Sequence, residues 1–155
     1  MWNRSCTLFF YGMLSAVLAQ LPTALWAQTK GPSTKPNSPL KFEVYEDSAK
    51  EYRWRLVEGN DKDRQVLATG GQGYKAKADC LHEVKSIQQG IDKLKFETYL
   101  DRAQKNRWRA KASNGQEVAA SGSSYKTKAE CEEAVQAMKK VAPKATIEQI
   151  TKGRE

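Results

Sequence analysis

The sequence predicts an α+β fold in which two tandem units, each of three strands and a helix, form one antiparallel sheet with both helices on one face. Two observations support this prediction. Three sequence blocks occur twice, in the same order and with similar gaps. Within each copy, apolar residues first alternate at every second position and then recur at helical spacing. One unit could not bury its helix-covered face alone, so we expect the two to join edge to edge around an approximate twofold axis.

The repeated blocks are a strand that begins with Lys-Phe-Glu, an Arg-Trp-Arg triplet and a Tyr-Lys segment that leads to a cysteine. In the first copy they are Lys41–Tyr45, Arg53–Arg55 and Tyr74–Cys80. In the second copy they are Lys95–Tyr99, Arg107–Arg109 and Tyr125–Cys131. Trp54 and Trp108 are therefore expected to be equivalent anchors beneath the two helices.

In the first unit, residues 41–90, the alternation is clearest around Trp54, which shares one strand face with Tyr52 and Leu56. Apolar residues at helical spacing follow, and Gly90 is expected to end the helix. The predicted elements are strands over Lys41–Glu46, Glu51–Val57 and Gln65–Thr69 and a helix over Lys77–Gln89.

The second unit, residues 91–142, repeats this order. Asn114 and Gly115 predict a tight hairpin, because both turn positions favour positive φ. Thr127 and Glu130 fit a capping box at the helix start, whereas Ala76 leaves the first helix without that cap. The predicted elements are strands over Leu94–Leu100, Arg107–Ala112 and Glu117–Ser121 and a helix over Lys128–Lys140.

Residues 1–27 have the layout of a secretory signal peptide. One positive charge precedes the uncharged stretch Cys6–Leu21, and small residues then lead to a cleavage position after Ala27. The alternatives are an uncleaved anchor, although this stretch is shorter than the about 20 residues that span a bilayer, and a buried helix, which nothing later in the chain requires. Export would place the protein in the periplasm or outside the cell, with membrane contact only through this signal.

Residues 28–40 predict a disordered linker, since prolines among Gly, Ser, Thr and Asn cannot form a core. The next proline is Pro143, so the folded domain is expected over residues 41–151. Within it, residues 143–151 predict a closing strand around Ala145–Thr151, and residues 152–155 form a tail.

The composition excludes several kinds of catalytic chemistry and indicates a basic surface. His82 is the single histidine, which excludes His-based metal sites and Ser-His-Asp triads, and no Cys-x-x-Cys is present. Gly70–Gly73 precedes a helix but lacks the following Lys-Ser/Thr of a phosphate loop, so it is interpreted as a turn. No catalytic residue, metal site or cofactor is predicted. The net charge of +8 favours anionic partners.

The order Phe-Glu-x-Tyr, Arg-Trp-Arg and Tyr-Lys-x-Lys-Ala-x-Cys resembles the YegP-like family of small tandem-repeat proteins, over about residues 41–140. The resemblance implies three strands and a helix per repeat, with the strand after the helix exchanged between repeats. It supports the strand at Ala145–Thr151 and implies that Leu94–Leu100 both closes the first copy and opens the second. The family is of unknown function, so no activity, ligand or catalytic residue is transferred.

Cys80 and Cys131 occupy the same place in the two predicted helices. In an oxidising compartment such a pair invites a disulfide, which requires Cα atoms within about 7 Å. Helices that cross near their starts would allow the bond, and helices that run antiparallel would not. Because the cysteine motif also occurs in family members without export signals, two free, buried thiols are the favoured interpretation.

The sheet face away from the helices is predicted to gather arginines and tyrosines. Guanidinium and phenol groups at alternate strand positions could bind a polyanion. The simpler interpretation is a solvated strand face, with Glu43 and Glu97 pairing locally across it. The residues predicted on this face are Arg53, Arg55, Arg107, Arg109, Lys111, Tyr45 and Tyr99.

Two hypotheses for function result. The first is a non-catalytic structural or interaction module of the periplasm or cell exterior. The second is a binder of anionic envelope polymers (cell-wall glycan, lipopolysaccharide or nucleic acid) through the arginine and tyrosine face. The sequence indicates neither a small-molecule substrate nor a specific partner.

Overall fold

The computed structural model describes residues 38–150, so the predicted signal peptide, most of the predicted linker and residues 151–155 lie outside the described part. Seven strands and two α helices follow one another along the chain, and each α helix continues into a 3-10 turn. The strands are β1 Leu40–Glu46, β2 Tyr52–Glu58, β3 Gln65–Gly70, β4 Lys95–Leu100, β5 Asn106–Lys111, β6 Glu117–Ser121 and β7 Thr146–Gln149. The helices are α1 Lys77–Gly90 with η1 Ile91–Lys93, and α2 Lys128–Val141 with η2 Ala142–Lys144.

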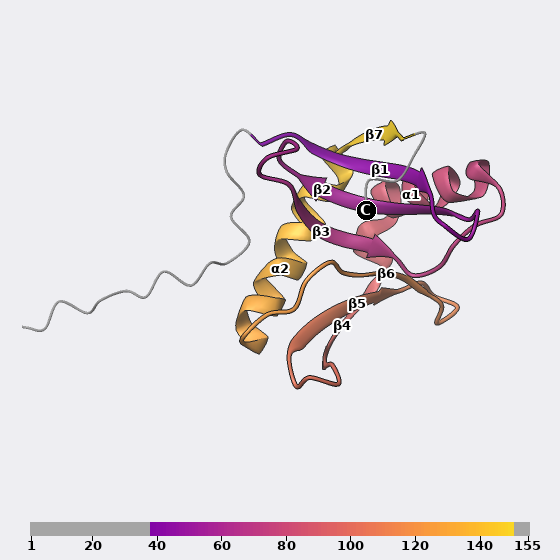
Figure 1. Ribbon diagram of the computed structural model, residues 1–155. Helices are drawn as coiled ribbons and strands as arrows, with labels where there is room; N and C mark the ends of the chain where they lie inside the picture. Colours follow the sequence, from indigo (N-terminus) through magenta and orange to yellow (C-terminus); the bar gives the residue numbers. More distant parts are fainter. Residues whose placement is uncertain (1–37, 151–155) are drawn as a thin grey trace, which may run out of the picture.

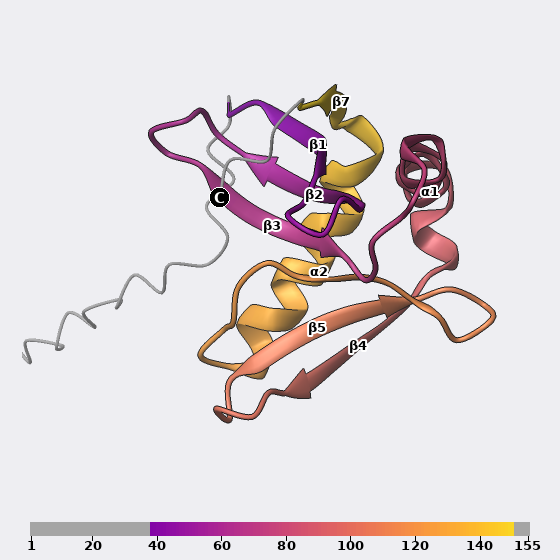
Figure 2. The same ribbon diagram turned by 45° about the vertical axis from the view of Figure 1, so that its right-hand side comes forward.

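All seven strands belong to one sheet, in the order β4-β5-β6-β3-β2-β1-β7. Neighbouring strands are antiparallel, except that β7 runs parallel to β1. The two halves meet at the centre, where Thr69 of β3 lies opposite Ala120 of β6. Figure 1 shows β7, from the end of the chain, beside β1 from its beginning, and Figure 2 shows β4 at the other side of the sheet. The predicted α+β fold is confirmed, with a mostly antiparallel sheet.

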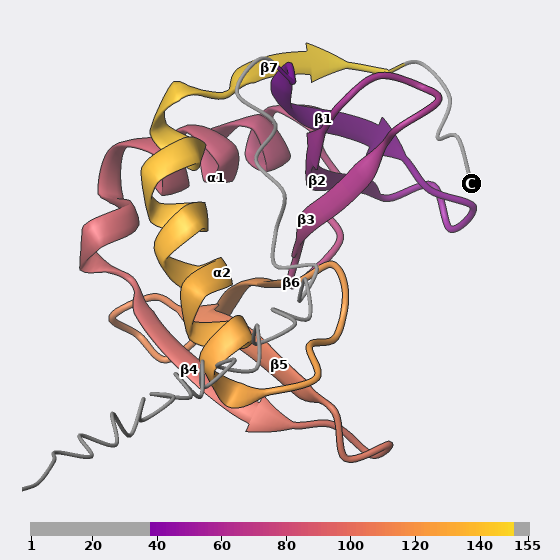
Figure 3. The same ribbon diagram turned by 90° about the vertical axis from the view of Figure 1, so that its left-hand side faces the viewer.

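Both helices cover the same side of the sheet (Figure 3). Their buried side chains share one hydrophobic core with Trp54 and Trp108, each of which is 1% exposed. Phe42 packs against Trp54 with ring centroids 5.4 Å apart, and Phe96 packs against Trp108 at 5.6 Å. The two tryptophans thus have matching surroundings, while the twofold axis stays a prediction. The buried helix residues are Cys80, Val84, Ile87, Cys131, Ala134, Val135 and Met138.

Gly90 is the last residue of α1, as predicted, with a φ of −122°, and the chain continues directly into the 3-10 turn η1. The β5–β6 turn differs from its prediction. At the β5–β6 hairpin, Gly115 has a φ of 82°, but Asn114 is not among the residues with positive φ. The Asn114 side chain instead accepts a hydrogen bond from the Gln116 N–H at 3.0 Å. The hairpin is therefore a turn followed by a glycine bulge.

The predicted double role of Leu94–Leu100 is wrong. The strand after α1 is β4, which pairs with β5. β4 therefore opens the second half. It does not also close the first half, because it pairs with no strand of that half among the described residues. Among the strands of residues 38–150, none pairs with the outer edge of β4.

Glycines allow the two halves to approach at the seam between β3 and β6. A Cβ atom on Gly71 would collide with the Glu117 carbonyl oxygen, and one on Gly122 would collide with the Val66 carbonyl oxygen. The glycine-rich run after β3 therefore has a packing role at the seam.

Candidate functional site

On the sheet face away from the helices, each half of the molecule holds a central carboxylate among several cations. Successive strand residues point to opposite faces, so Glu43 and Glu97 point away from the core side chains Phe42 and Phe96. The register places Glu43 opposite Arg55 and Glu97 opposite Arg109. We name the two groups the Glu43 cluster (Lys41, Glu43, Arg55, Arg64 and Glu148) and the Glu97 cluster (Lys95, Glu97, Arg109 and Lys111).

The Glu43 cluster surrounds a buried carboxylate. Arg55 Nε donates to Glu43 at 2.8 Å, and the Arg64 guanidinium donates to the same oxygen. Lys41 Nζ lies 3.5 Å from Glu43 and 2.8 Å from Glu148 of β7. The hydrogen bond to Glu148 raises the pKa of Lys41. The Glu43 side chain is only 4% exposed, so its charge depends on these cations for compensation.

The Glu97 cluster is more open. Lys111 Nζ lies 2.9 Å from Glu97, Arg109 Nε 3.2 Å and Lys95 Nζ 3.4 Å. The Lys111 hydrogen bond, together with the other cations, lowers the pKa of Glu97 to about 2. The Lys95 side chain is 76% exposed. Together with Lys93 and Lys111 it lines a surface hollow beside Glu97.

Each half of the molecule contains one stacked arginine–tyrosine pair from the predicted arginine and tyrosine face. The Arg55 guanidinium lies 4.5 Å from the centroid of Tyr45, and the Arg109 guanidinium lies 5.2 Å from that of Tyr99. These stacked pairs bring together four of the predicted residues, two in each half. Lys111 joins the second half through Glu97.

The remaining two arginines of that face are held by the strand hairpins. Arg53 Nε donates to Asp47 at 2.6 Å, and Arg107 Nε donates to Asp101 at 3.0 Å. In each loop the aspartate also accepts backbone N–H groups, and the one from Glu51 is the largest cause of the lowered pKa of Asp47. All four predicted arginines therefore pair with a carboxylate of the same face.

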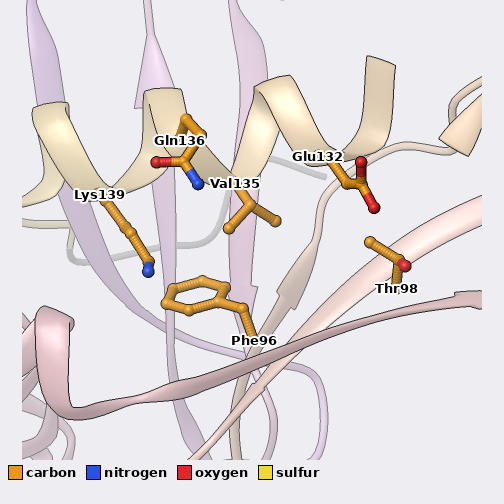
Figure 4. A pocket seen from close by; sticks show the side chains of 6 residues that line it. All are labelled: Phe96, Thr98, Glu132, Val135, Gln136 and Lys139. Atoms are coloured by element: carbon orange, nitrogen blue, oxygen red, sulfur yellow. The ribbon is translucent and has the colours of Figure 1, made fainter. Parts of the chain in front are cut away.

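A groove lies on the helix side of the sheet, between β4 and α2, and the sequence did not predict it. It encloses about 270 Å³. Figure 4 shows the Phe96 ring facing α2. The Lys139 ammonium lies 5.1 Å from the centroid of that ring. One sequence signal could have revealed it: two repeated units are followed by a single closing strand. The lining residues are Phe96, Thr98, Glu132, Val135, Gln136 and Lys139.

The same strand carries exposed apolar surface. Within residues 38–150, the exposed large hydrophobic side chains are Tyr99, 36% exposed, and Leu100, 56% exposed. Both lie at the end of β4. An unpaired strand edge, an adjoining groove and exposed apolar side chains thus coincide at one border of the sheet.

The two cysteines of the domain are buried and free. Burial raises the pKa of the Cys80 thiol to about 12 and that of Cys131 to about 11, so neither is an activated nucleophile at neutral pH. Near the end of α1, Gln88 donates to the carbonyls of Ala142 and Ala145. The helices therefore meet near their C-terminal ends, whereas the cysteines lie in their first turns.

In the part of the chain that the structure describes, no three His, Cys, Asp or Glu side chains are grouped so that they could hold a metal ion. The helices between residues 38 and 150 lack the length and apolar composition that crossing a membrane requires.

Comparison with known protein families gives one match, which occurs twice in the chain. The model of DUF1508, a domain of unknown function, matches residues 47–90 and 101–149, together more than half of the chain. A UPF0339 protein from the ptx operon 5′ region of Stutzerimonas stutzeri is 34% identical over 110 residues, which cover 70% of this chain and 95% of that protein. The UPF0339 protein Atu0232 of Agrobacterium fabrum is 42% identical over 48 residues, covering 31% of this chain and 71% of the relative.

Two solved structures share the fold. The yegP protein of E. coli, described as of unknown function, superposes with a TM-score of 0.61 at 20% identity, covering 76% of this chain and 98% of that one. The UPF0339 protein SO3888 of Shewanella oneidensis gives a TM-score of 0.59 at 19% identity, covering 72% and 92%. At this identity the likeness concerns the fold alone.

Proposed function

Because the chain belongs to the DUF1508 family, for which no function is known, we propose a role from its own geometry: a non-catalytic module that binds another polypeptide. The observation that supports this role is the outer edge of β4. Its backbone has no partner strand within the described residues, and Tyr99 and Leu100 expose apolar surface beside it. Soluble proteins usually protect such edges, because unpaired strands recruit other chains.

The chemistry of the charged groups supports binding over catalysis. The carboxylates of the sheet face are engaged by arginines and lysines, and the thiols are buried with raised pKa values. The carboxylates hold strands together through these ion pairs. Neither the paired carboxylates nor the buried thiols are suited to exchange protons with a substrate.

A site-specific photo-crosslinker tests this function. A photoreactive residue replaces Leu100, and the matched control replaces Glu46, which occupies the corresponding place on β1. We expect discrete cross-linked polypeptides from position 100 in cells that produce the protein, and none of these from position 46. If position 100 cross-links no polypeptide, the proposed role is contradicted.

We also propose that the module acts in the periplasm or outside the cell. The support is the signal-peptide pattern of residues 1–27, which lie outside the described structure. Cell fractionation together with N-terminal sequencing tests this. An N-terminus at Gln28 in the envelope or medium is the expected result, and an intact N-terminus in the cytoplasm would refute export.

A second candidate function is binding of anionic envelope polymers. The hollow lined by Lys93, Lys95 and Lys111 favours it, because Glu97 is the one acidic residue in that lining. The predicted arginines contribute less, since each pairs with a carboxylate, whereas Lys95 and Lys111 share Glu97 and Lys93 lines the same hollow. We expect heparin retention to fall in a variant with all three lysines replaced by Gln, and to fall less in the variant with Arg53, Arg55, Arg107 and Arg109 replaced by Ala. A larger loss of heparin retention in the arginine variant would assign the anion site to the arginines.

A further inference from the structure

In the first half of the molecule, β7 covers the outer edge of β1. Ile147 of β7 lies opposite Phe42, which is completely buried. Gln88 of α1 donates to the carbonyls of Ala142 at 3.3 Å and Ala145 at 2.7 Å, just before that strand. One short parallel strand therefore completes the apolar core on this side.

The same strand completes the charge balance on the opposite face. Glu148 follows Ile147 and points to the other side of the sheet. It accepts a hydrogen bond from Lys41 at 2.8 Å, and Lys41 also contacts Glu43. The edge of β1 thus binds a strand in which an aliphatic residue is followed directly by an acidic residue.

The second half has the matching strand edge, on β4, and no strand of the described residues covers it. Phe96 corresponds to Phe42 and Lys95 to Lys41 in the repeated blocks, and Lys139 corresponds to Gln88 by its distance from the helix cysteine. Phe96 is only partly buried and lines the open groove. The Lys139 ammonium lies over the Phe96 ring, near the place where an incoming strand would present carbonyl groups.

The backbone of β4 is oriented for the same pairing. The Asp101 N–H donates to Lys105 across the hairpin, so residues at odd positions of β4 face β5. The N–H and C=O groups of Phe96 and Thr98 consequently face outwards. On β1 the residue that matches Thr98 is Val44, whose carbonyl accepts from the Ile150 N–H at 2.8 Å.

We propose that the outer edge of β4 binds an extended strand of another protein, parallel to β4, as β1 binds β7. This deepens the proposed function and rests on it. The bound strand has an aliphatic residue that enters the groove beside Phe96, followed by Asp or Glu that pairs with Lys95. Charge complementarity supports this occupant, because Lys93, Lys95 and Lys111 surround the single carboxylate of Glu97. A second copy offering its own β4 would bring the same lysines together.

A peptide with the sequence of residues 145–150, Ala-Thr-Ile-Glu-Gln-Ile, is the probe. It is titrated into the purified, isotope-labelled protein, and backbone amide shifts are recorded. We expect saturable shifts at Phe96, Thr98 and the groove side of α2, with β1 unchanged. Shifts confined to β1, which would mean exchange with β7, or no saturable shift at β4, would overturn the proposal.

Two matched pairs of variants test the geometry. Thr98→Pro removes the outward N–H without removing a hydrogen bond to β5, and should abolish binding, whereas Thr98→Val keeps the N–H and should bind normally. Lys95→Glu should weaken binding about fivefold, since both the lost attraction and the new repulsion act at an exposed site. A peptide with Lys in place of the Glu should recover affinity for this variant. Equal binding by Thr98→Pro and Thr98→Val would overturn strand addition.

The strand proposal and the general function can fail separately. If Leu100 cross-links polypeptides but the peptide does not bind β4, the module has a partner and the parallel-strand mode is wrong. A concentration-dependent dimer with contacts through β4, detected by sedimentation and the same amide shifts, assigns the edge to a second copy and overturns the proposal. If cross-linking also fails, the interaction function itself is refuted.

Discussion

The two outer regions of the sheet begin with nearly the same residues and end in different surroundings. Lys41-Phe42-Glu43 lies between β2 and β7, whereas Lys95-Phe96-Glu97 lies beside β5 alone among the described strands. Glu43 is 4% exposed and Glu97 is 27% exposed. Phe42 is buried and Phe96 is partly exposed.

The added strand and the β2–β3 loop account for this difference, because the clusters share their other contacts. In both, an arginine from the neighbouring strand binds the glutamate and stacks on a tyrosine. The first also receives Arg64 from the β2–β3 loop and Glu148 from β7. A repeated motif therefore serves as buried structure in one half and leaves an accessible edge in the other.

Removing the central carboxylates should give the largest contrast between the halves. Glu43→Ala leaves Arg55, Arg64 and Lys41 without their common partner in a buried place, and should lower the free energy of unfolding by about 3 kcal/mol. Glu97→Ala should cost much less, because its cations reach solvent. Urea unfolding of both variants measures the difference. Equal losses would show that burial does not distinguish the two clusters.

The tryptophans offer a second contrast. Trp54 Nε1 donates to Glu83 of α1 at 2.8 Å, whereas α2 has Ala134 at the matching place. Glu83→Ala should lower the free energy of unfolding by about 2 kcal/mol, because a buried donor loses its charged acceptor. Glu83→Gln keeps an acceptor and should lose less. A neutral effect of Glu83→Ala in thermal unfolding would contradict this role for the carboxylate.

The helix starts differ by one hydroxyl group. The Thr127 side chain accepts from the Glu130 N–H at 3.2 Å, while Ala76, the N-cap of α1, makes no such bond. Ala76→Ser should raise the free energy of unfolding by about 1 kcal/mol, and Thr127→Ala should lower it by a similar amount. The melting temperatures of the two variants should therefore move in opposite directions. A lower melting temperature for Ala76→Ser would place the start of α1 elsewhere.

The repeat made much of the fold predictable from sequence. Alternation around Trp54 and Trp108 located the strands, and helical spacing located α1 and α2 within a residue or two. A family resemblance that implied an exchanged strand supported the existence of β7, but its parallel pairing with β1 was not predicted. The prediction of positive φ at both turn positions was wrong for Asn114, because its side chain accepts a hydrogen bond from the Gln116 backbone N–H and so stabilises a bulge that the dipeptide alone does not specify.

The site was less predictable, because it depends on which strand lacks a neighbour. The ion pairs of the predicted arginine face depend on cross-strand register and on loop residues such as Arg64, which lies far from Glu43 in sequence. The groove beside Phe96 exists because β7 adds to β1 and not to β4. Periodicity within a segment cannot reveal which edge remains open.

The smallest expected effect is a pH dependence that belongs to the open half. Lys111 and the other cations hold the pKa of Glu97 at about 2, below its ordinary value of 4.5. These ion pairs therefore contribute fully to stability above pH 4.5, and the contribution is lost as the pH falls towards 2. Glu97→Gln should remove this part of the acid dependence, while Asp47 and Asp101, whose pKa values are also lowered, act equally in both proteins. Parallel melting-temperature curves for the two proteins between pH 5 and pH 2 would show that the exposed cluster contributes little, and that only the strand-covered half uses its carboxylate for stability.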